Sequence, residues 1–274
     1  MEGVPMIHLK DVSVRYRDDL VALQPTSLRF GRGEFTVLLG ASGAGKSTLL
    51  RCLNLLTKPS TGQINVDGIG AIEGSAALQA HRRQTGMVFQ QHQLIERHTA
   101  LANVLLGRIG YHATWRSLFP LPRAERQIAL ECLNRVGLLH KALARVDQLS
   151  GGQQQRVGIA RALAQQPRLM LADEPVASLD PASSRRVLSQ LKQICREDGI
   201  TTVVSLHQVE LAMEYADRVI GLAHGRVVFD GSPDTLNAGV LDMIYDQTPP
   251  VPAPPAGTTH RPNHPSLELA IIED

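Results

Sequence analysis

One feature constrains the fold of this chain more than any other, the glycine-rich run Gly40-Ala41-Ser42-Gly43-Ala44-Gly45-Lys46-Ser47. It fits the phosphate-loop pattern, in which glycines let successive backbone N–H groups turn inward onto a phosphate. An apolar run, 35–39, precedes the loop, and apolar residues at helical spacing follow it. We therefore predict a strand, a loop and a helix that hold ATP. Lys46 would reach its β- and γ-phosphates, Ser47 would ligate Mg²⁺, and Thr48 would adjoin the nucleotide.

A second apolar run, 169–172, ends in two carboxylates, Asp173 and Glu174. Opposite a phosphate loop, Asp173 would hold Mg²⁺ and Glu174 would polarise the attacking water. The alternative is a strand that simply ends in solvated acids. Pro175 and the turn Ser178-Leu179-Asp180 follow, which indicates a structured turn rather than a charged surface run.

A third motif, Leu149-Ser150-Gly151-Gly152-Gln153, precedes a long helical pattern. A serine and two glycines at a helix N-terminus make another anion site, and a single phosphate loop does not require one. This second anion site predicts that two copies of the chain bind one ATP from opposite sides. An ordinary capped helix start is the alternative.

The order of apolar patterns predicts an α/β fold. Strands are expected at 7–14, 35–39, 63–66, 87–89, 169–172, 201–206, 219–222 and 226–229. Their alternation with helices in the C-terminal half predicts a parallel sheet with helices on both faces. One of these helices would be capped by Asp180, with Pro181 at its first position. From about 91 to 166 only helical patterns occur, which indicates an inserted helical subdomain.

The remaining composition narrows the class. Seven of the sixteen prolines lie in 248–274, so we expect a disordered tail there. The formal net charge of +2 predicts no bulk attraction to nucleic acid. Cys52, Cys132 and Cys195 lack metal-ligand spacing and are interpreted as buried apolar residues in a reducing compartment. We expect neither a secretory signal nor a membrane span, and hence a cytoplasmic chain.

Taken together, the motifs resemble those of the nucleotide-binding subunits of ATP-binding-cassette (ABC) transporters, over about Ile7 to Gly231. They follow the family order: Tyr16, the phosphate loop, Gln90 in Val88-Phe89-Gln90, the Leu149–Gln153 motif, Asp173-Glu174, Asp180, and His207 after the 201–206 strand. The resemblance implies a P-loop NTPase (RecA-like) core, about 1–90 and 167–247, with an N-terminal antiparallel β portion. The helical subdomain would span about 91–166, so that one ATPase domain covers 1–247.

The resemblance also implies roles for these residues. Tyr16 would stack on adenine, and Gln90 would reach the metal and link the site to the helical subdomain. Glu174 would act as general base, with His207 sensing the γ-phosphate. Two copies would pair head to tail, so that each ATP touches the phosphate loop of one copy and Ser150, Gly151, Gly152 and Gln153 of the other, beside Asp180.

Three further segments are similar to the phosphonate-importer subfamily, which includes phosphite importers: 107–119, with Trp115 and Phe119, 172–181, and Ser205-Leu206-His207-Gln208-Val209. The implied partners are two integral-membrane permease subunits at the cytoplasmic face of the inner membrane, and indirectly a periplasmic solute-binding protein. Phosphate or a polar amino acid remains open as the solute. Trp115 and Phe119 would either contact a permease or pack inside the helical subdomain.

Two rival classes are weighed against a transporter. ABC proteins of DNA repair carry long coiled-coil insertions, and the stretch between Ser47 and Leu149 has no sustained heptads. Translation-type members hold two cassettes in one chain, and this chain has one. A regulator without turnover would lack Lys46, Glu174 or His207, and all three are present.

Overall fold

The computed structural model describes residues 6–16, 20–91, 93–112 and 121–245. Its strands are β1 (Ile7–Arg15), β2 (Val21–Phe30), β3 (Phe35–Leu39), β4 (Thr61–Val66), β5 (Gly70–Ala71), β6 (Thr85–Val88), β7 (Leu169–Asp173), β8 (Thr201–Ser205), β9 (Arg218–Ala223) and β10 (Arg226–Gly231). Its α-helices are α1 (Lys46–Leu53), α2 (Gly74–Arg83), α3 (Ala100–Leu105), α4 (Arg123–Arg135), α5 (Gly151–Ala164), α6 (Pro181–Glu197), α7 (Val209–Tyr215) and α8 (Ala238–Tyr245). Trp115, Phe119 and the predicted tail 248–274 lie outside the described residues.

The strands form two sheets. The larger has the order β10-β9-β3-β8-β7-β6, and its pairs from β9 to β6 are parallel. The smaller has the order β2-β1-β4-β5 and is antiparallel. The predicted α/β class, with a parallel sheet and an N-terminal antiparallel β portion, is confirmed. One difference is that β10 pairs with β9 antiparallel, as the second arm of a tight hairpin.

Strand β2 is absent from the sequence prediction because Pro25 interrupts its pattern. A proline lacks the N–H group that a ladder needs, so inside a sheet it is confined to edge strands and bulges. Strand β2 is at the edge of the smaller sheet, and its register with β1 shifts between the pairs Val12↔Thr26 and Val14↔Leu23. Pro25 is therefore accommodated at an irregular position of an edge strand.

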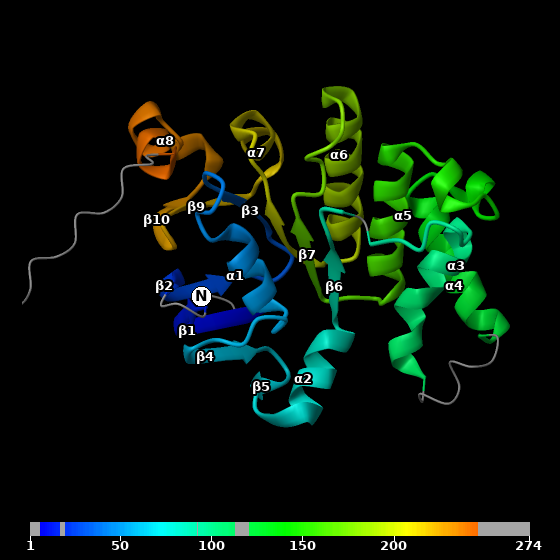
Figure 1. Ribbon diagram of the computed structural model, residues 1–274, viewed down its shortest axis with the longest axis horizontal. Coiled ribbons are helices and arrows are strands. Elements are labelled where there is room, and N and C mark those ends of the chain that lie inside the picture. Colours follow the sequence, from blue (N-terminus) through cyan, green and yellow to red (C-terminus); the bar gives the residue numbers. More distant parts are fainter. Residues whose placement is uncertain (1–5, 17–19, 92, 113–120, 246–274) are drawn as a thin grey trace, which may run out of the picture.

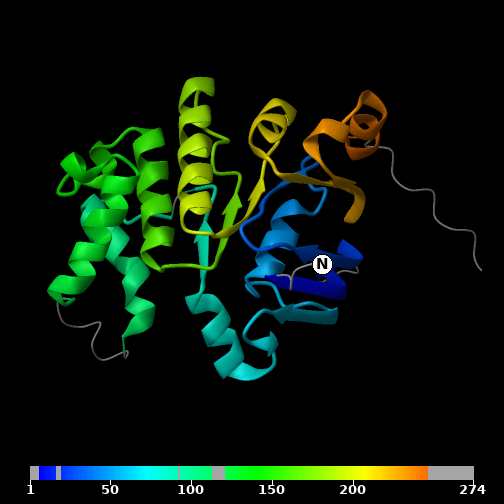
Figure 2. The same cartoon turned by 180° about the vertical axis from the view of Figure 1, so that it is seen from behind.

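Helix α1 lies between the two sheets, with β1, β2 and β4 on one side of it (Figures 1 and 2). Its buried Leu49, Leu50 and Leu53 join an apolar cluster that includes one face of the large sheet. The period of two along a strand sends alternate residues to opposite faces. In β3, Leu38 belongs to this cluster, whereas Val37 and Leu39 belong to the cluster on the other face.

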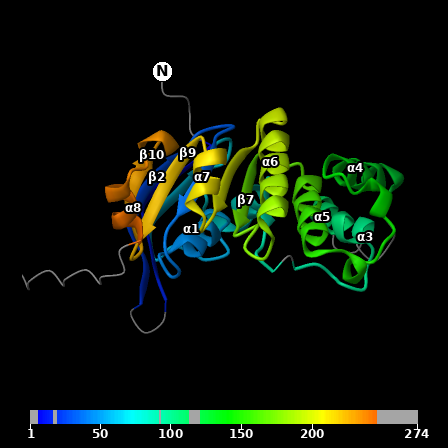
Figure 3. The same cartoon turned by 90° about the horizontal axis from the view of Figure 1, so that it is seen from above.

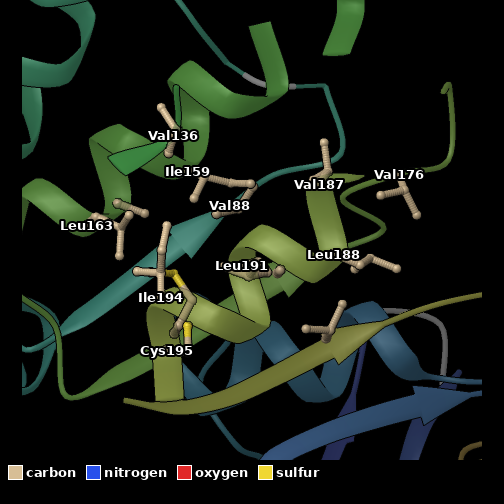
Figure 4. Close-up of a cluster of buried hydrophobic side chains, with 14 of the residues drawn as sticks. Val88, Val136, Ile159, Leu163, Val176, Val187, Leu188, Leu191, Ile194 and Cys195 are labelled. Carbon is tan, nitrogen blue, oxygen red and sulfur yellow. The ribbon is translucent and has the colours of Figure 1, made fainter. Parts of the chain in front are cut away.

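Helices α5, α6, α7 and α8 cover that second face. The apolar side chains of α6 form a stripe that is buried there: Val187, Leu188, Leu191, Ile194 and Cys195 (Figure 4). The helix begins as predicted, since the Asp180 side chain accepts a 2.9 Å hydrogen bond from Ser183 N and Pro181 occupies the first turn. All three cysteines are free and buried, as expected.

Helices α3, α4 and α5 gather at the β6 end of the large sheet, to one side of it (Figure 3). Between residues 93 and 166 the described segments contain helices and the single bridge Thr99↔Arg145, but no strand. Arg108, in the 3-10 helix η2 (Leu106–Tyr111), is buried and ties these helices together. Its guanidinium donates to the Ala164 carbonyl oxygen at 2.7 Å and forms an ion pair with Glu125 of α4. We call α3, η2, α4 and α5 the helical lobe.

Candidate nucleotide-binding site

The glycine-rich loop connects the carboxyl end of β3 to the first turn of α1. Gly40 (φ +154°) and Gly45 (φ +107°) have backbone conformations that other residues rarely adopt. There is also no room for a side chain, because a Cβ on Gly40 would lie 2.3 Å from the Leu222 carbonyl oxygen, and one on Gly45 2.8 Å from that of Ala22. The loop thus depends on glycine for contact with β9 and β2 as well as for its turn.

Lys46 crosses the inside of this loop. Its Nζ donates hydrogen bonds to the carbonyl oxygens of Gly40 at 2.8 Å and Ala41 at 3.0 Å, and the residue is only 4% exposed. Burial lowers the pKa of this ammonium group, while the carboxylates of Glu174 and Asp173 raise it in part. Lys46 also lines the cavity into which the loop opens, so the loop itself holds a cation beside that cavity.

The loop opens into a cavity of about 400 Å³. Its lining comprises Ala22, Ser42, Gly43, Ala44, Gly45, Lys46, Ser47, Thr48, Gln90, Glu174 and His207. Residues from β2, the loop, the end of β6, the end of β7 and the end of β8 therefore meet at one place. Ligands of parallel sheets characteristically bind beyond the carboxyl ends of the strands.

Ser47 and Asp173 face each other across this site. The Ser47 hydroxyl donates a 2.8 Å hydrogen bond to Oδ1 of Asp173, which is 6% exposed. Both are hard oxygen donors, and Mg²⁺ is usually held by one or two such protein groups together with waters and substrate phosphates. Among the described residues no cluster of three or more His, Cys, Asp or Glu side chains could hold a metal by itself. The pair fits a magnesium ion that arrives with a nucleotide.

Glu174 follows in the left-handed conformation, at φ +48°. Its Oε2 accepts a 2.9 Å hydrogen bond from Gln90 Nε2, and its Oε1 pairs with Nε2 of His207. The sequence places these three residues far apart, at the ends of β6, β7 and β8. The sheet brings them together, because β6, β7 and β8 are neighbours and parallel.

Tyr16 lies at the rim rather than in the cavity. It is 40% exposed, and its hydroxyl is 3.5 Å from Oγ1 of Thr48. An exposed ring beside the start of α1 is accessible to a planar group stacked on it.

The predicted second anion site, Ser150–Gln153, is not part of this cavity. Ser150 caps α5, accepting from Gln153 N at 3.4 Å, while the Gln153 side chain accepts from Ser150 N at 3.0 Å. Gly151 and Gly152 lie beside Leu179, next to Asp180. The structure thus joins the Ser150–Gln153 motif to the Asp180 turn and keeps both away from the lining of the phosphate-loop cavity.

Two residues of the site were not identified from the sequence. Ala22 lines the cavity, and Ser205 contacts both Asp173 and Glu174 from β8. Ala22 belongs to no motif, and Ser205 opens the Ser205–Val209 segment without a role assigned to it. The strand order reveals that both lie at the site.

A phosphate loop between a strand and a helix, facing two carboxylates at the end of another strand of the same parallel sheet, defines a P-loop nucleotide-binding protein. The family model described as "ABC transporter" matches residues 23–177. The chain belongs to the ABC transporter family and is an ATP-binding, ATP-hydrolysing cassette of it.

Curated relatives match over most of the chain. A phosphonates import ATP-binding protein PhnC 3 of Nostoc sp. is 65% identical over 88% of this chain and 92% of its own length. The phosphite import ATP-binding protein PxtA of Stutzerimonas stutzeri is 60% identical over 91% of each chain.

Solved structures match as well. The dimeric, post-hydrolysis structure of the ATP-binding cassette MJ0796 bound to ADP and Pi gives a TM-score of 0.73 at 38% identity, over 83% of this chain and 99% of that one. The structure of cbiO1 from Clostridium perfringens, part of the ABC transporter complex cbiONQ, gives a TM-score of 0.75 at 30% identity, over 85% of this chain and 90% of that one.

Proposed function

We propose that this chain is the energy-coupling ATPase subunit of an importer for phosphonate or phosphite. The observation that carries the proposal is its high identity, along nearly the whole cassette, to import ATP-binding proteins named for these two solutes. Phosphonate and phosphite are both tetrahedral phosphorus oxyanions, so one transporter architecture suits both. The solute itself would be selected by other subunits.

In the proposed reaction, Lys46 and the N–H groups of residues 40–47 bind the phosphates. Glu174 acts as the general base that takes a proton from the attacking water. His207 and Gln90, which both contact its carboxylate, hold that carboxylate and the water in position. The support for this role is that Glu174 and Lys46 line the same cavity.

Ser47, Asp173 and Gln90 are the proposed ligands of Mg²⁺, of which the first two lie in contact. The ion would neutralise charge on the β- and γ-phosphates. Once the Ser47 hydroxyl turns to the ion, Asp173 loses a hydrogen-bond donor, and its remaining contacts must keep it in place.

A second copy of the chain is the proposed partner across the nucleotide. The support is the division of the site, because Ser150, Gly151, Gly152, Gln153 and Asp180 lie together but outside the phosphate-loop cavity. Ser150 and Gly151 are exposed at the N-terminus of α5, and a helix N-terminus suits a γ-phosphate presented by another copy. Head-to-tail pairing would complete two such sites at once.

The permease subunits are proposed to dock on an open groove of about 650 Å³ between α2 and the helical lobe. It is lined by Ser75, Ala76, Leu78, Gln79, Arg82, Arg83, Leu106, Gly107, Gly110, Tyr111 and Gln165. Across the described segments, no helix has the length and apolar character to span a bilayer. Attachment through permeases would place the chain at the cytoplasmic face of the inner membrane.

The test is ATP hydrolysis by the chain assembled with permease subunits and a solute-binding protein from the same organism. In proteoliposomes, methylphosphonate or phosphite should stimulate hydrolysis, and phosphate or a polar amino acid should not. Glu174→Gln in the same assembly serves as the inactive control. Stimulation by phosphate or an amino acid alone would contradict the assigned solutes, and assembly with ribosomes or DNA instead of a permease would contradict transport.

A further inference from the structure

Strand β8 ends in a polar side chain to which no role has been assigned. Ser205 is the last residue of β8 and is fully buried, at 0% exposure. Burying a hydroxyl group costs free energy unless it is hydrogen-bonded. Here the hydroxyl group both donates and accepts a hydrogen bond, and both partners belong to the site.

The two contacts run to consecutive residues of the neighbouring strand. Ser205 Oγ donates a 2.9 Å hydrogen bond to Oδ1 of Asp173 and accepts one of 2.9 Å from the backbone N–H of Glu174. The parallel register pairs Asp173 directly with Ser205, so the strand pairing itself fixes these distances. Glu174 is also the residue whose backbone is left-handed, at φ +48°.

Asp173 Oδ1 accepts from two hydroxyl groups, those of Ser47 and Ser205. In the proposed function the Ser47 hydroxyl moves to Mg²⁺, and the Ser205 hydroxyl then remains on the carboxylate. Groups that hydrogen-bond a metal ligand fix its orientation, and their loss typically lowers metal affinity or activity about 10- to 100-fold.

We propose that Ser205 is a positioning residue for the magnesium site, which orients the Asp173 carboxylate and anchors the backbone of Glu174. Ser205 is buried and does not line the phosphate-loop cavity, so it acts only through these two residues. The inference rests on the proposed metal role of Asp173 and extends it to a residue to which neither the motifs nor the family resemblance gives a role.

The test measures magnesium-dependent binding of a fluorescent methylanthraniloyl-ATP to the purified full chain, which needs no turnover. We expect Ser205→Ala to bind the probe as the wild type does in EDTA. The Mg²⁺ concentration for half-maximal enhancement of binding should rise about tenfold. Ser205→Thr keeps the hydroxyl and should stay within about twofold of the wild type. Ser205→Cys keeps a side chain of similar size but with only a weak hydrogen-bond donor, so its Mg²⁺ dependence should shift as that of Ser205→Ala does. If Ser205→Ala does not fold, Ser205→Cys takes its place in the test.

Two controls make the outcome specific. Thr202→Val removes another buried hydroxyl from β8, one that donates to the Ile200 carbonyl oxygen at 3.2 Å and lies away from the site. It should leave the Mg²⁺ dependence unchanged. The proposal would be overturned if Thr202→Val shifted the Mg²⁺ dependence as much as the Ser205 variants do. It would also be overturned if neither Ser205→Ala nor Ser205→Cys shifted that dependence.

Asp173→Asn separates this inference from the function beneath it. If Asp173→Asn shifts the Mg²⁺ dependence and the Ser205 variants do not, only the role of Ser205 fails. If Asp173→Asn leaves it unchanged, the metal role of Asp173 fails and the role of Ser205 fails with it.

Discussion

The Gln90 side-chain amide donates a 2.9 Å hydrogen bond to Oε2 of Glu174. The other oxygen of the same carboxylate pairs with His207. Residues that follow β6 and β8, the two strands beside β7, therefore both bind the Glu174 carboxylate. Gln90 begins the connection from β6 to the helical lobe. The carboxylate proposed as general base is thus linked directly to the segment that joins the sheet to the lobe.

Glu174→Gln tests the base directly. The amide keeps the size of the side chain but cannot accept a proton, and general-base catalysis contributes about 10²- to 10⁴-fold. We expect kcat to fall by at least about 100-fold, with ATP affinity within about threefold of the wild type. Size-exclusion chromatography with ATP should show the variant accumulating as a dimer. Glu214→Gln alters an exposed glutamate paired with Arg185 and should match the wild type. Near-normal turnover in Glu174→Gln would remove Glu174 from the base role.

Gly107→Ala tests the packing of the groove wall. A Cβ on Gly107 would lie 2.3 Å from the Arg161 carbonyl oxygen, so η2 must move away from α5. Overpacking of this kind typically costs about 1–3 kcal/mol. Gly110 lies in the same 3-10 helix and has nothing within 4 Å of its Cβ position, so Gly110→Ala should be neutral or slightly stabilising. Urea denaturation of both variants measures the difference, and equal stabilities would show that η2 yields without cost.

His81 predicts a loss of stability on mild acidification. The imidazole is 0% exposed, and its Nε2 donates to the Leu53 carbonyl oxygen at 2.7 Å. Burial holds its pKa below the ordinary value of 6.5, although the bond to Leu53 opposes this. Between the lower folded pKa and 6.5, His81 therefore binds a proton in the unfolded chain but stays neutral in the folded chain. The free energy of unfolding should fall as pH drops from 6.5 towards the lower folded pKa, by at most about 1.4 kcal/mol per pH unit.

Urea denaturation between pH 7.5 and 5 measures this slope. His81→Gln, which has no group that titrates in this range, should flatten the slope between pH 6.5 and 5. His140→Gln removes an exposed imidazole and should preserve it. If the slope persists in His81→Gln, the acid sensitivity originates elsewhere.

Much of the site could be predicted because its elements are local patterns. Fewer than ten consecutive residues define each of these elements: the phosphate loop, the end of β7 and the capped starts of α5 and α6. The sequence predicts where these elements lie along the chain, and the parallel arrangement of the large sheet follows from their alternation. The particular roles given to Glu174, His207 and Gln90 stay predictions.

What could not be predicted depends on neighbours distant in the sequence. Ser205 becomes informative only once β8 is known to pair with β7. Strand β2 carries Pro25 within its alternation of buried and exposed residues, and helix α2 buries His81 alone, so neither is recognisable from an apolar pattern by itself. The antiparallel β10 follows a turn at His224 and Gly225, both in left-handed conformations that no periodicity indicates. In each case a tertiary contact decided the structure.

Tyr245 offers a test of how the His207 segment is held. Its hydroxyl donates a 3.1 Å hydrogen bond to the His207 carbonyl oxygen, and its neighbour Ile244 is fully buried, so α8 is a firm support. Tyr245→Phe removes only the hydroxyl, and a net hydrogen bond is worth about 0.5–1.5 kcal/mol. If the bond helps to hold the imidazole at Glu174 during hydrolysis, kcat should fall by about two- to tenfold with the KM for ATP unchanged. The matched control is Tyr215→Phe, which removes a hydroxyl that donates to the Arg185 carbonyl oxygen at 3.3 Å, away from the site. Equal kcat values in the two variants would mean that the peptide group of His207 keeps its place without Tyr245, held by β8 and α7 alone.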